Sequence, residues 1–429
     1  MVRELKHMEI GDIPVDWKLQ TFDETFRVIS NNTLSRENLN NRGGAVRNIH
    51  YGDILTKFPE VLDCNEEEIP YVNELSLLSS STQLLQDGDI VVADTAEDET
   101  VGKVIEVQNL GDSKLVAGLH TIPCRVKKGD FAPGWLGYYM NSDLFHNQIL
   151  PYITGIKVSS ISKGAISKTL ILVPPFDEQE KIVQSLNKIQ LLMTAETKVV
   201  NKIKLVKNGC LSKMFPQKDD TVPKMRLPGF TEAWEQRKLE DIYGSIGNAF
   251  VGTATPYYVE SGHFYLESNN IKDGQINHNT EVFINDEFYE KQKDKWLHTG
   301  DMVMVQSGHV GHAAVIPEEL NNSAAHALIM FRNPKKEIEP YFLNYQYQTL
   351  KSKKKIENIT TGNTIKHILA SEMQQFEVDM PELAEQKKIA EYFRALDHLI
   401  TLHQCKCDKY SNIKKGMMSD LLTGKIRLV

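Results

Sequence analysis

Few positions in the sequence combine residues able to bind a metal ion or activate water. His309 and His312 are three residues apart in His309-Val310-Gly311-His312, and two imidazoles can bind a divalent metal. The flanking glycine and the lack of a neighbouring carboxylate favour a loop over a metal site. Glu385-Gln386-Lys387 has the acid-x-lysine spacing found in nucleases, but no paired acid lies upstream, and the similar Glu178-Gln179-Glu180 lacks the lysine. These segments predict neither a metal site nor a nuclease site.

Group-transfer motifs are also incomplete. Val173-Pro174-Pro175-Phe176 resembles the Asn/Asp-Pro-Pro-Tyr/Phe motif of amino-methyltransferases, but valine cannot hydrogen-bond a target amino group. The two prolines are more simply explained as the end of a strand and the start of a helix. The sequence has no GxxxxGKS/T phosphate loop and no convincing GxGxxG segment. We therefore predict no catalytic residue, no bound metal and no cofactor held by this chain.

The composition is that of an ordinary globular protein. Of the 429 residues, 41% are hydrophobic and 25% are charged, which predicts two or three domains with full cores. No apolar run approaches the ~18 residues of a membrane span, and Met1-Val2-Arg3-Glu4-Leu5-Lys6 lacks the apolar core of a signal peptide. Five cysteines without a Cys-x-x-Cys pair argue against zinc and disulfide frameworks. The net charge of -8 excludes an overall basic protein but not a local cationic patch, and we expect a cytoplasmic location.

The chain contains an internal repeat. Thr154-Gly155 recurs 207 residues later as Thr361-Gly362, and Lys207-Asn208-Gly209 recurs at the same distance as Lys414-Lys415-Gly416. Near the front of each half the distance is 217 residues, which places Trp17 on Trp234. The middles of the two halves thus differ in length by about ten residues, while their ends keep the same order. We interpret the ends as a shared scaffold and the middles as modules of different content.

A long helix closes each repeat, and the first is expected to open at Asp177 with a near capping box to Glu180. Each helical pattern spans about 38 residues, or ~57 Å at the helical rise. We predict that the two helices form an antiparallel coiled coil about a pseudo-twofold axis. The alternative is two unrelated amphipathic helices, each packed on its own domain. The heptad spacing gives one seam position per helix, at Ile182, Ile189, Glu196 and Ile203 in the first and at Ile389, Leu396, His403 and Tyr410 in the second. A companion position lies three residues later and contains Leu192, Val199 and Val206 in the first helix and Tyr392, Leu399 and Ile413 in the second.

Glu196 and His403 occupy the polar midpoints of the two predicted seams. Our hypothesis is that their side chains face each other and fix the register of the helices, as single polar seam residues can. The alternative is that both side chains point into solvent.

Short strand-like segments separated by Gly, Asn and Asp fill residues 15–165 and 230–370, which predicts a compact α+β module in each half. The loops of these modules carry side chains able to contact base edges, and Lys351, Lys353, Lys354 and Lys355 form a cluster on a predicted helix that could contact phosphates. The alternative is ordinary solvated surface. The residues that we expect at a DNA surface are Arg36, Arg42, Thr95, Lys103, Thr154, Lys157, Asn269, Gln306, Ser307, His309, Lys353, Lys354, Thr361, Asn363 and Lys366.

The order of these features resembles the specificity subunits of type I restriction-modification systems. Residues 174–182 (Pro-Pro-Phe-Asp-Glu-Gln-Glu-Lys-Ile) and 381–390 (Pro-Glu-Leu-Ala-Glu-Gln-Lys-Lys-Ile-Ala) look like the start of that family's long helices, and residues 421–427 look like its usual tail. Gly300-Asp301 with Ser307-Gly308 looks like the core of its recognition domains. The likeness covers essentially the whole chain. One departure is the acidic segment at residues 94–99, where the second half has Gln306-Ser307-Gly308-His309.

The resemblance implies a non-catalytic subunit that gives a type I restriction-modification complex its DNA specificity. Two target recognition domains would each bind one half of a bipartite double-stranded DNA target, with the paired helices as the spacer. The implied partners are DNA, two methyltransferase subunits and the restriction subunits, and no membrane. S-adenosylmethionine, Mg and ATP would be used by those partner subunits. The rival functions are a stand-alone DNA-binding or protein-interaction scaffold and a self-contained restriction-methylation enzyme.

These inferences divide the chain into four segments. Residues 1–170 are predicted as target recognition domain 1 and residues 219–377 as target recognition domain 2. Residues 171–218 and 378–429 are predicted as the two long helices.

Removing one heptad from both helices is expected to shorten the unread spacer of the DNA target and to leave both half-sites unchanged. The reason is that helix length sets the separation of two modules that read one face of a duplex. Sequencing methylated DNA made by the shortened chain together with its methyltransferase measures the spacer directly. A spacer of unaltered length would refute the role of the helices as a ruler.

Overall fold

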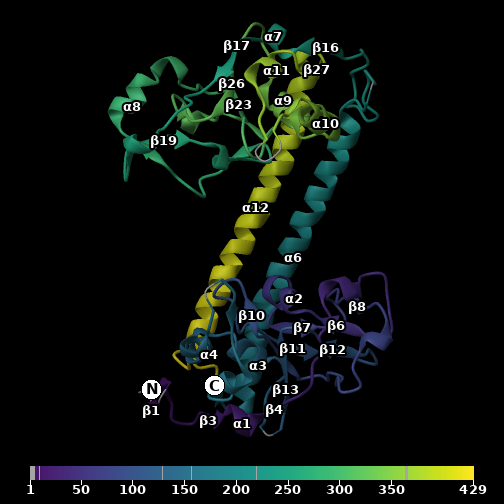
Figure 1. The fold of residues 1–429 in the computed structure, drawn as a ribbon, viewed down its shortest axis with the longest axis vertical. Coiled ribbons are helices and arrows are strands. Elements are labelled where there is room, and N and C mark those ends of the chain that lie inside the picture. Colours follow the sequence, from purple (N-terminus) through teal and green to yellow (C-terminus); the bar gives the residue numbers. More distant parts are fainter. Residues whose placement is uncertain (1–4, 9, 128, 156, 219, 363–365) are drawn as a thin grey trace. The chain divides into compact units, whose positions relative to one another are not determined.

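The computed structural model describes residues 5–8, 10–127, 129–155, 157–218, 220–362 and 366–429. The chain forms two compact units (Figure 1). Unit 1 comprises residues 1–196 and 406–429, and unit 2 comprises residues 197–405. None of the described helices is both long and apolar enough to cross a membrane.

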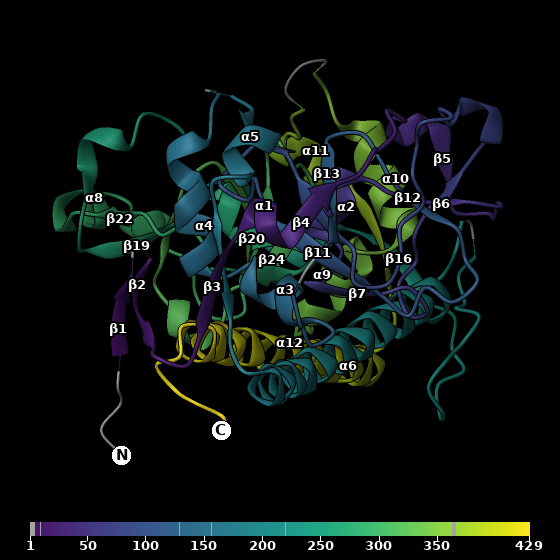
Figure 2. The same ribbon diagram turned by 90° about the horizontal axis from the view of Figure 1, so that it is seen from below.

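Both units contain parts of two long helices, α6 (Phe176–Met214) and α12 (Leu383–Leu421), each of 39 residues. Figure 2 shows the two helices side by side. Within unit 1, Gln190 of α6 is paired with Lys414 of α12, and within unit 2 Lys207 of α6 is paired with Asp397 of α12. Later residues of α6 therefore meet earlier residues of α12, which confirms the predicted antiparallel pairing.

The start of α6 differs from the expectation. Asp177 lies inside the first turn and does not cap the helix, because the helix already begins at Phe176. Gln179 takes part at this end instead, since its Nε2 donates to the carbonyl of Pro174 at 2.8 Å. Gln386 makes the equivalent bond to Pro381 at 2.9 Å in α12.

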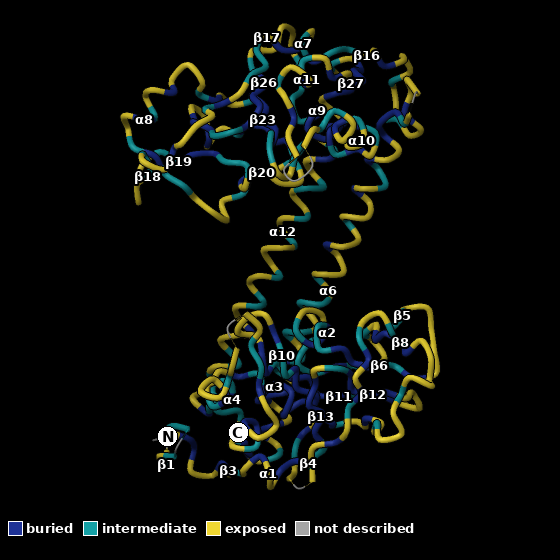
Figure 3. The backbone as a smooth tube through the Cα atoms, in the orientation of Figure 1, coloured by how far each residue is buried: buried dark blue, intermediate teal, exposed yellow. Residues whose placement is uncertain are grey.

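The companion position of the helix seam was predicted one residue too early. Leu192, Val199 and Val206 are exposed, as are Leu399 and Ile413, whereas Tyr392 is half-buried. The position four residues after each seam residue is covered instead, as at Val200 in α6 and Phe393 in α12. Figure 3 shows half-buried and exposed residues alternating along both helices. The eight seam positions named from the sequence are all buried or half-buried: Ile182, Ile189, Glu196, Ile203, Ile389, Leu396, His403 and Tyr410.

The position four residues after the seam includes a lysine in each helix. Because lysine interrupts the apolar pattern, the sequence did not reveal this position as the companion. Lys207 Nζ donates to Asp397 Oδ1 at 2.6 Å and lies 5.2 Å from the centre of the Tyr345 ring. The Tyr345 hydroxyl donates to the other Asp397 oxygen at 2.8 Å. We call Lys207, Asp397 and Tyr345 the Lys207 cluster. It joins α6, α12 and the globular part of unit 2.

Unit 1 contains an equivalent Lys414 cluster, made of Lys414, Gln190, Glu60 and Tyr138. Lys414 Nζ donates to Gln190 Oε1 at 2.7 Å and to a carboxylate oxygen of Glu60, and it lies 5.3 Å from the centre of the Tyr138 ring. Each member except Glu60 lies 207 residues from its counterpart in the Lys207 cluster. The internal repeat therefore extends to buried polar contacts.

Glu196 is engaged near the midpoint of α6. One of its carboxylate oxygens lies 3.5 Å from Lys406 Nζ of α12, within unit 1. The hypothesis that Glu196 faces His403 stays a prediction.

The central sheet of unit 1 has five strands. Three antiparallel pairings and one parallel pairing, between β11 and β7, hold it together. The four-stranded sheet beside it contains one parallel pairing, between β12 and β6. In sheet order, the first sheet is β4 (Phe26–Val28), β13 (Thr121–Val126), β9 (Ile90–Ala93), β11 (Val104–Gln108) and β7 (Val61–Asp63), and the second is β12 (Leu115–Ala117), β6 (Arg47–Ile49), β8 (Tyr71–Val72) and β5 (Leu39–Asn40).

Unit 2 repeats this strand order without a counterpart of β7 among its described residues. Its second sheet again contains one parallel pairing, between β19 and β25. The middles of the two halves, expected to differ, therefore share one topology. In sheet order, the first sheet is β17 (Tyr243–Asn248), β26 (Leu328–Pro334), β23 (Met302–Val305) and β24 (Ala313–Val315), and the second is β18 (Tyr258–Val259), β22 (Phe283–Ile284), β19 (His263–Leu266) and β25 (Ala324–Ala325).

A two-stranded ribbon leads into each long helix. In unit 1, β3 (Lys18–Thr21) pairs with β15 (Leu170–Val173), and in unit 2, β16 (Glu235–Lys238) pairs with β27 (Glu377–Met380). The remaining paired strands are β1 (Leu5–Met8) with β2 (Gly11–Pro14), β10 (Thr95–Ala96) with β14 (Ser159–Ser160), and β20 (Ile271–Lys272) with β21 (Gln275–Ile276).

Short helices complete both units, and all of them except α2 and α8 correspond in order. Unit 1 has α1 (Phe22–Thr25), α2 (Tyr51–Thr56), α3 (Trp135–Tyr139), α4 (Asp143–Ile149) and α5 (Lys163–Ile166). Unit 2 has α7 (Leu239–Ile242), α8 (Asp286–Lys291), α9 (Pro340–Tyr347), α10 (Leu350–Ile359) and α11 (Ala370–Gln374). The lysine-rich helix predicted after Tyr341-Phe342-Leu343 is confirmed as α10.

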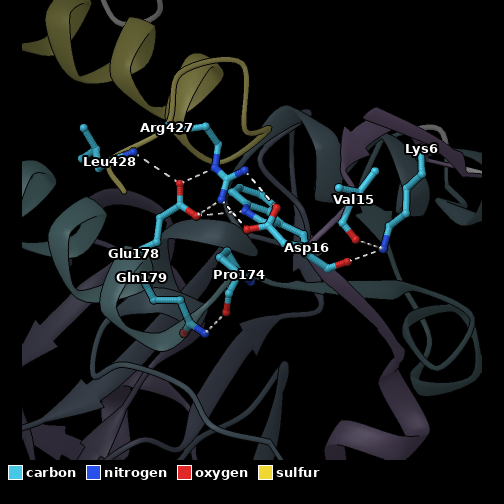
Figure 4. Close-up of polar contacts among 9 residues, drawn as sticks. Lys6, Val15, Asp16, Pro174, Glu178, Gln179, Arg427 and Leu428 are labelled. Carbon is cyan, nitrogen blue, oxygen red and sulfur yellow. Dashed lines mark hydrogen bonds and ion pairs between the residues drawn. The ribbon is translucent and has the colours of Figure 1, made fainter. Parts of the chain in front are cut away.

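The first turn of α6 anchors the chain ends of unit 1 (Figure 4). The Glu178 carboxylate, which is almost fully buried, accepts hydrogen bonds from Trp17 Nε1 at 3.0 Å and from Arg427 Nε at 2.6 Å. Arg427 also donates to Asp16 at 2.7 Å, and this contact lowers the pKa of the Asp16 carboxyl. The Glu178 side chain thereby joins the first strands, α6 and the segment after α12.

Unit 2 uses a related contact at the first turn of α12. The buried Glu385 carboxylate receives two hydrogen bonds of 2.8 Å from the Arg226 guanidinium. Trp234, the counterpart of Trp17, packs edge-on against Phe215 with ring centres 5.9 Å apart. An arginine–glutamate pair therefore stabilises the start of both long helices.

Replacing the covered Val200 with alanine is expected to lower the free energy of unfolding by about 1–3 kcal/mol, because two buried methyl groups are lost. Replacing the exposed Val199 with alanine changes the helix propensity by the same amount. This variant is expected to lower the free energy of unfolding by less than about 0.5 kcal/mol. Urea unfolding of the two variants followed by circular dichroism measures the difference. A greater loss of unfolding free energy for Val199→Ala than for Val200→Ala would show that Val199 occupies the buried companion position, as predicted from the sequence.

Candidate nucleic-acid interface

In unit 2, two loops meet where the buried strand β23 ends. The chain leaves the strand through Gln306 and Ser307, and a second loop is closed by reciprocal backbone bonds between Thr361 and His367 of 2.8 and 2.9 Å. Ser307 pairs with His367, and Gln306 O accepts from Ile368 N at 3.0 Å. We call this pair of loops the loop frame of unit 2.

Unit 1 has the same loop frame. Thr154 and Ser160 are joined by reciprocal backbone bonds of 2.8 and 3.0 Å, and Thr95 pairs with Ser160. Asp94 O accepts from Ile161 N at 2.9 Å. The backbone contacts of the two frames therefore correspond one to one, although the sequences of their first loops differ.

The Thr-Gly pair found in both halves is explained by this frame. Gly155 and Gly362 have φ angles of +118° and +99°, which residues with a side chain rarely adopt. A Cβ atom at Gly155 would also lie 1.9 Å from the carbonyl oxygen of Val158. Glycine is thus required in unit 1 for the second loop to turn back on itself.

Cationic side chains surround the frame of unit 2. Lys353 of α10 and Lys366 of the second loop line a cleft of about 490 Å³ together with His309 and His312. Lys366 lies 3.9 Å from the carboxylate of Glu357, and both side chains are largely exposed. The positive charge of Lys366 is therefore not paired with a buried carboxylate and is exposed in the cleft.

The lysines of α10 have different surroundings. Lys351 is buried and donates to Asp379 at 2.7 Å, and Lys355 donates to the carbonyl of Glu377 at 3.3 Å. Lys353 and Lys354 are exposed, and of these two Lys353 lines the cleft. The predicted lysine cluster therefore divides into two structural and two solvent-facing residues.

Asn269 lines a second hollow of about 280 Å³ on the loop frame of unit 2, which also includes Ser307. Its neighbour Asn270 is buried and donates to the carbonyls of Asn277 and Thr280 at 3.1 and 2.8 Å. The two adjacent amides thus have different tasks, with Asn270 holding the turn and Asn269 facing solvent.

In unit 1 the frame adjoins aromatic and basic residues. Thr95 Oγ1 lies 3.2 Å from His120 Nδ1, and the His120 ring meets Tyr51 edge-on at 5.3 Å. Tyr51 in turn packs on His50 at 4.7 Å. Arg36 donates to Asp53 of α2 at 2.7 Å and keeps half of its side chain exposed.

Two residues expected at the DNA surface of unit 1 lie outside its loop frame. The Lys103 side chain is half-buried and donates to the carbonyl of Leu55 at 3.1 Å, so its ammonium anchors α2 and does not face a loop surface. Burial lowers the pKa of Lys103. Arg42 lies exposed in the turn after β5, where its backbone N–H donates to Asn40 at 2.8 Å.

Most of the other predicted residues gather at the two frames. Thr95, Thr154 and Lys157 belong to the frame of unit 1, and Ser307, His309, Thr361 and Lys366 to that of unit 2. Gln306 joins the second frame through its backbone, while its side-chain Oε1 is buried without a partner among the described residues. Asn363 lies outside the described residues.

Tyr51, His120 and Lys272 were missed by sequence reasoning. Tyr51 and His120 come from separate elements of unit 1, and nothing in their sequence context places them beside Thr95. Lys272 lies two residues after Asn270 of the Ser268-Asn269-Asn270 turn, and this position was the only sequence signal for it. Among the described residues, no group of three or more His, Cys, Asp or Glu side chains could hold a metal ion.

Comparison with known proteins agrees with this geometry. A family model for the type I restriction modification DNA specificity domain matches residues 14–205 and 231–409, so each match includes one loop frame. The chain belongs to the type I restriction-modification specificity family.

Members of this family share the chain's length and fold. The chain assigned as the type I restriction enzyme MjaX specificity subunit of Methanocaldococcus jannaschii is 24% identical over 429 residues, covering 99% of this chain and 96% of that one. The type I restriction-modification S subunit from M. genitalium has a similar fold, with a TM-score of 0.58 and 12% identity over 98% of this chain and 99% of that one. A solved chain from a study of type I R-M complex assembly has a TM-score of 0.54 and 14% identity over 96% and 99% of the two chains.

The stability of unit 1 is expected to fall as the pH drops below about 6.5, the ordinary pKa of histidine. His50 Nδ1 accepts from Gly52 N at 3.1 Å and caps α2, and burial, followed by Arg36, lowers the pKa of this imidazole. The unfolded chain therefore takes up a proton at a higher pH than the folded chain, so the stabilisation is complete above pH 6.5 and is lost on acidification.

Melting temperatures measured between pH 5 and 8 test this expectation. Asparagine is a strong N-cap without a titrating group, so His50→Asn is expected to keep the cap and to reduce the acid-induced fall. A residual slope is expected, because burial also lowers the pKa values of His146 and His312. An identical pH profile in wild type and variant would contradict the role of His50.

Proposed function

We propose that the two loop frames are the DNA-contacting parts of a non-catalytic specificity subunit, each frame recognising one half of a bipartite double-stranded target. The observation that carries this proposal is the repetition of one backbone frame with different side chains in the two units. Two frames of equal geometry can engage two half-sites in the same manner, and different side chains select different bases.

The two loop frames differ in how well their charges suit contact with DNA. The frame of unit 2 has exposed Lys353 and Lys366, which supply sequence-independent attraction to phosphates. The first loop of unit 1 contains Glu97, Asp98 and Glu99, all exposed. Unit 1 therefore depends more on Arg36, Lys157 and the cations of partner subunits for contact with the backbone of DNA.

The partners follow from family membership. A specificity subunit works in a type I restriction-modification complex, and we propose two methyltransferase subunits per chain, joined by restriction subunits, acting on DNA in the cytoplasm. S-adenosylmethionine, Mg and ATP are proposed to be used by those subunits. The chain itself is then expected to bind none of them.

Co-expression with the methyltransferase subunit of the same organism tests the proposed function. The expected result is a stable complex that methylates a split DNA motif, read by single-molecule sequencing, only when both proteins are present. Replacing Lys353 and Lys366 together with alanine is expected to lower the affinity of this complex for DNA about 10-fold or more at 150 mM salt, because two phosphate contacts are lost.

The remaining outcomes identify the rival functions. A chain that binds DNA but forms no complex with the methyltransferase would be a stand-alone scaffold. Methylation or cleavage by the isolated chain with S-adenosylmethionine would indicate a self-contained enzyme. Either result would overturn the proposal.

A further inference from the structure

The first loop of the unit 2 frame, residues 306–312, separates two hollows of different chemistry. One is the cleft of about 490 Å³ beside α10, and the other is the hollow of about 280 Å³ beside the turn Ser268–Asn270. Gly308, His309 and His312 line both. A ligand that spans the loop can thus contact both sets of side chains at once.

The larger cleft has two lysines that could hold a phosphate. Its cations are Lys353 and Lys366, and its floor includes Ile356, against which Gly311 packs so closely that a Cβ atom there would lie 2.7 Å from the Ile356 side chain. Glu357 lies 3.9 Å from Lys366 and holds that ammonium loosely. Lysine is a flexible point charge that accepts any phosphate and carries no sequence information.

The smaller hollow has neutral polar groups suited to base edges. Asn269 and Ser307 offer an amide and a hydroxyl, and Lys272 stands among the lining residues. An asparagine amide can pair with the N6 and N7 atoms of adenine in the major groove. The lining therefore differs in kind from that of the larger cleft.

The backbone of Asn269 is held in place while its side chain is exposed. The next residue, Asn270, accepts a hydrogen bond from Glu267 N at 2.9 Å and donates two more across the turn. Asn277 Nδ2 donates to the carbonyl of Asn269 at 3.2 Å. A side chain that recognises a base needs a backbone fixed in this way, because a mobile backbone lowers the discrimination between bases.

His312 adds a donor of defined chemistry. Its Nδ1 accepts from the backbone N–H of Asp273 at 3.3 Å, which leaves the proton of the neutral ring on Nε2. Burial lowers the pKa of this imidazole, with Lys353, His309 and Lys272 acting in the same direction, while Asp273 opposes them. The ring is therefore neutral at physiological pH and presents a single N–H.

We infer that Asn269, with Ser307 and His312, determines the base specificity of unit 2, with Asn269 recognising an adenine, and that Lys353 and Lys366 hold the neighbouring phosphate. This inference rests on the proposed function, since it divides the DNA contacts of one frame into base reading and backbone positioning.

The test uses the complex of the full chain with its methyltransferase subunit and the split motif found for the wild type. Affinities are measured for the cognate duplex and for duplexes with each base pair of the unit 2 half-site replaced, at several salt concentrations. Asn269→Ala is expected to reduce discrimination at one A·T pair by roughly 5- to 150-fold and to leave the other half-site and the salt dependence unchanged. Lys353→Ala is expected to weaken binding to all duplexes equally and to reduce the slope of log K against log salt by about 0.9.

Two further variants serve as controls. Lys291 is exposed on α8, and α8 lies well apart from α10 in Figures 1 and 2, so Lys291→Ala is expected to leave the base preference unchanged. Asn270→Ala is expected to lower the melting temperature, whereas Asn269→Ala is not, because only Asn270 is buried.

The outcomes separate this inference from the proposed function. If the wild-type complex methylates a split motif but Asn269→Ala keeps full discrimination at every base pair, the inference is wrong and the proposed function stands. A Lys353→Ala variant that changes base preference would also overturn it. If the wild-type complex recognises no split motif, the proposed function fails first.

Discussion

A lysine ammonium that leaves water must donate its hydrogen bonds to protein acceptors and gain a compensating charge, or its burial opposes folding. The long helices meet this demand at Lys207 in unit 2 and at Lys414 in unit 1. In both cases the acceptors come from the opposite long helix or from the globular part, and a tyrosine ring covers the ammonium. These contacts can form only when the two helices are antiparallel and in one register. The cores of both units contain residues of α6 and α12, so their packing depends on that register.

The arginine–glutamate contacts at the helix starts act beside these lysines. Glu178 and Glu385 occupy equivalent turns of α6 and α12, yet Glu178 receives Arg427 from the segment after α12 and Glu385 receives Arg226 from the segment after α6. In each unit the start of one long helix is thereby tied to the segment that follows the other. The long helices are parts of the two folded cores and not separate linkers.

The loop frames show how one fold can present two different surfaces. Backbone hydrogen bonds fix the frame, so the side chains of residues 94–99 and 306–309 can differ without a change in loop geometry. Carboxylates in unit 1 accept hydrogen bonds from amino groups but repel phosphates, whereas the frame of unit 2 combines neutral amides with lysines. The difference between the two loop frames therefore lies in side-chain chemistry and not in their backbone hydrogen bonds.

The sequence by itself determined the repeat, the two long helices, their antiparallel pairing and the α+β class of each module, because these depend on periodicity and on ordered matches along the chain. It placed Thr95, Thr154, Ser307 and Lys366 among the candidates for the frames, because Thr-Gly turns and strand ends leave local signals. Only the tertiary structure decided that the covered companion of the seam is Val200 and not Val199, because a buried lysine interrupts the apolar pattern. Asn269 and Lys353 were among the residues predicted at the DNA surface, whereas Asn270 and Lys351 were not, but only the tertiary structure showed that Asn270 and Lys351 are held by hydrogen bonds while Asn269 and Lys353 are exposed. Neighbouring residues of one type have similar sequence signals, and their roles differ through the partners that the folded chain places beside them.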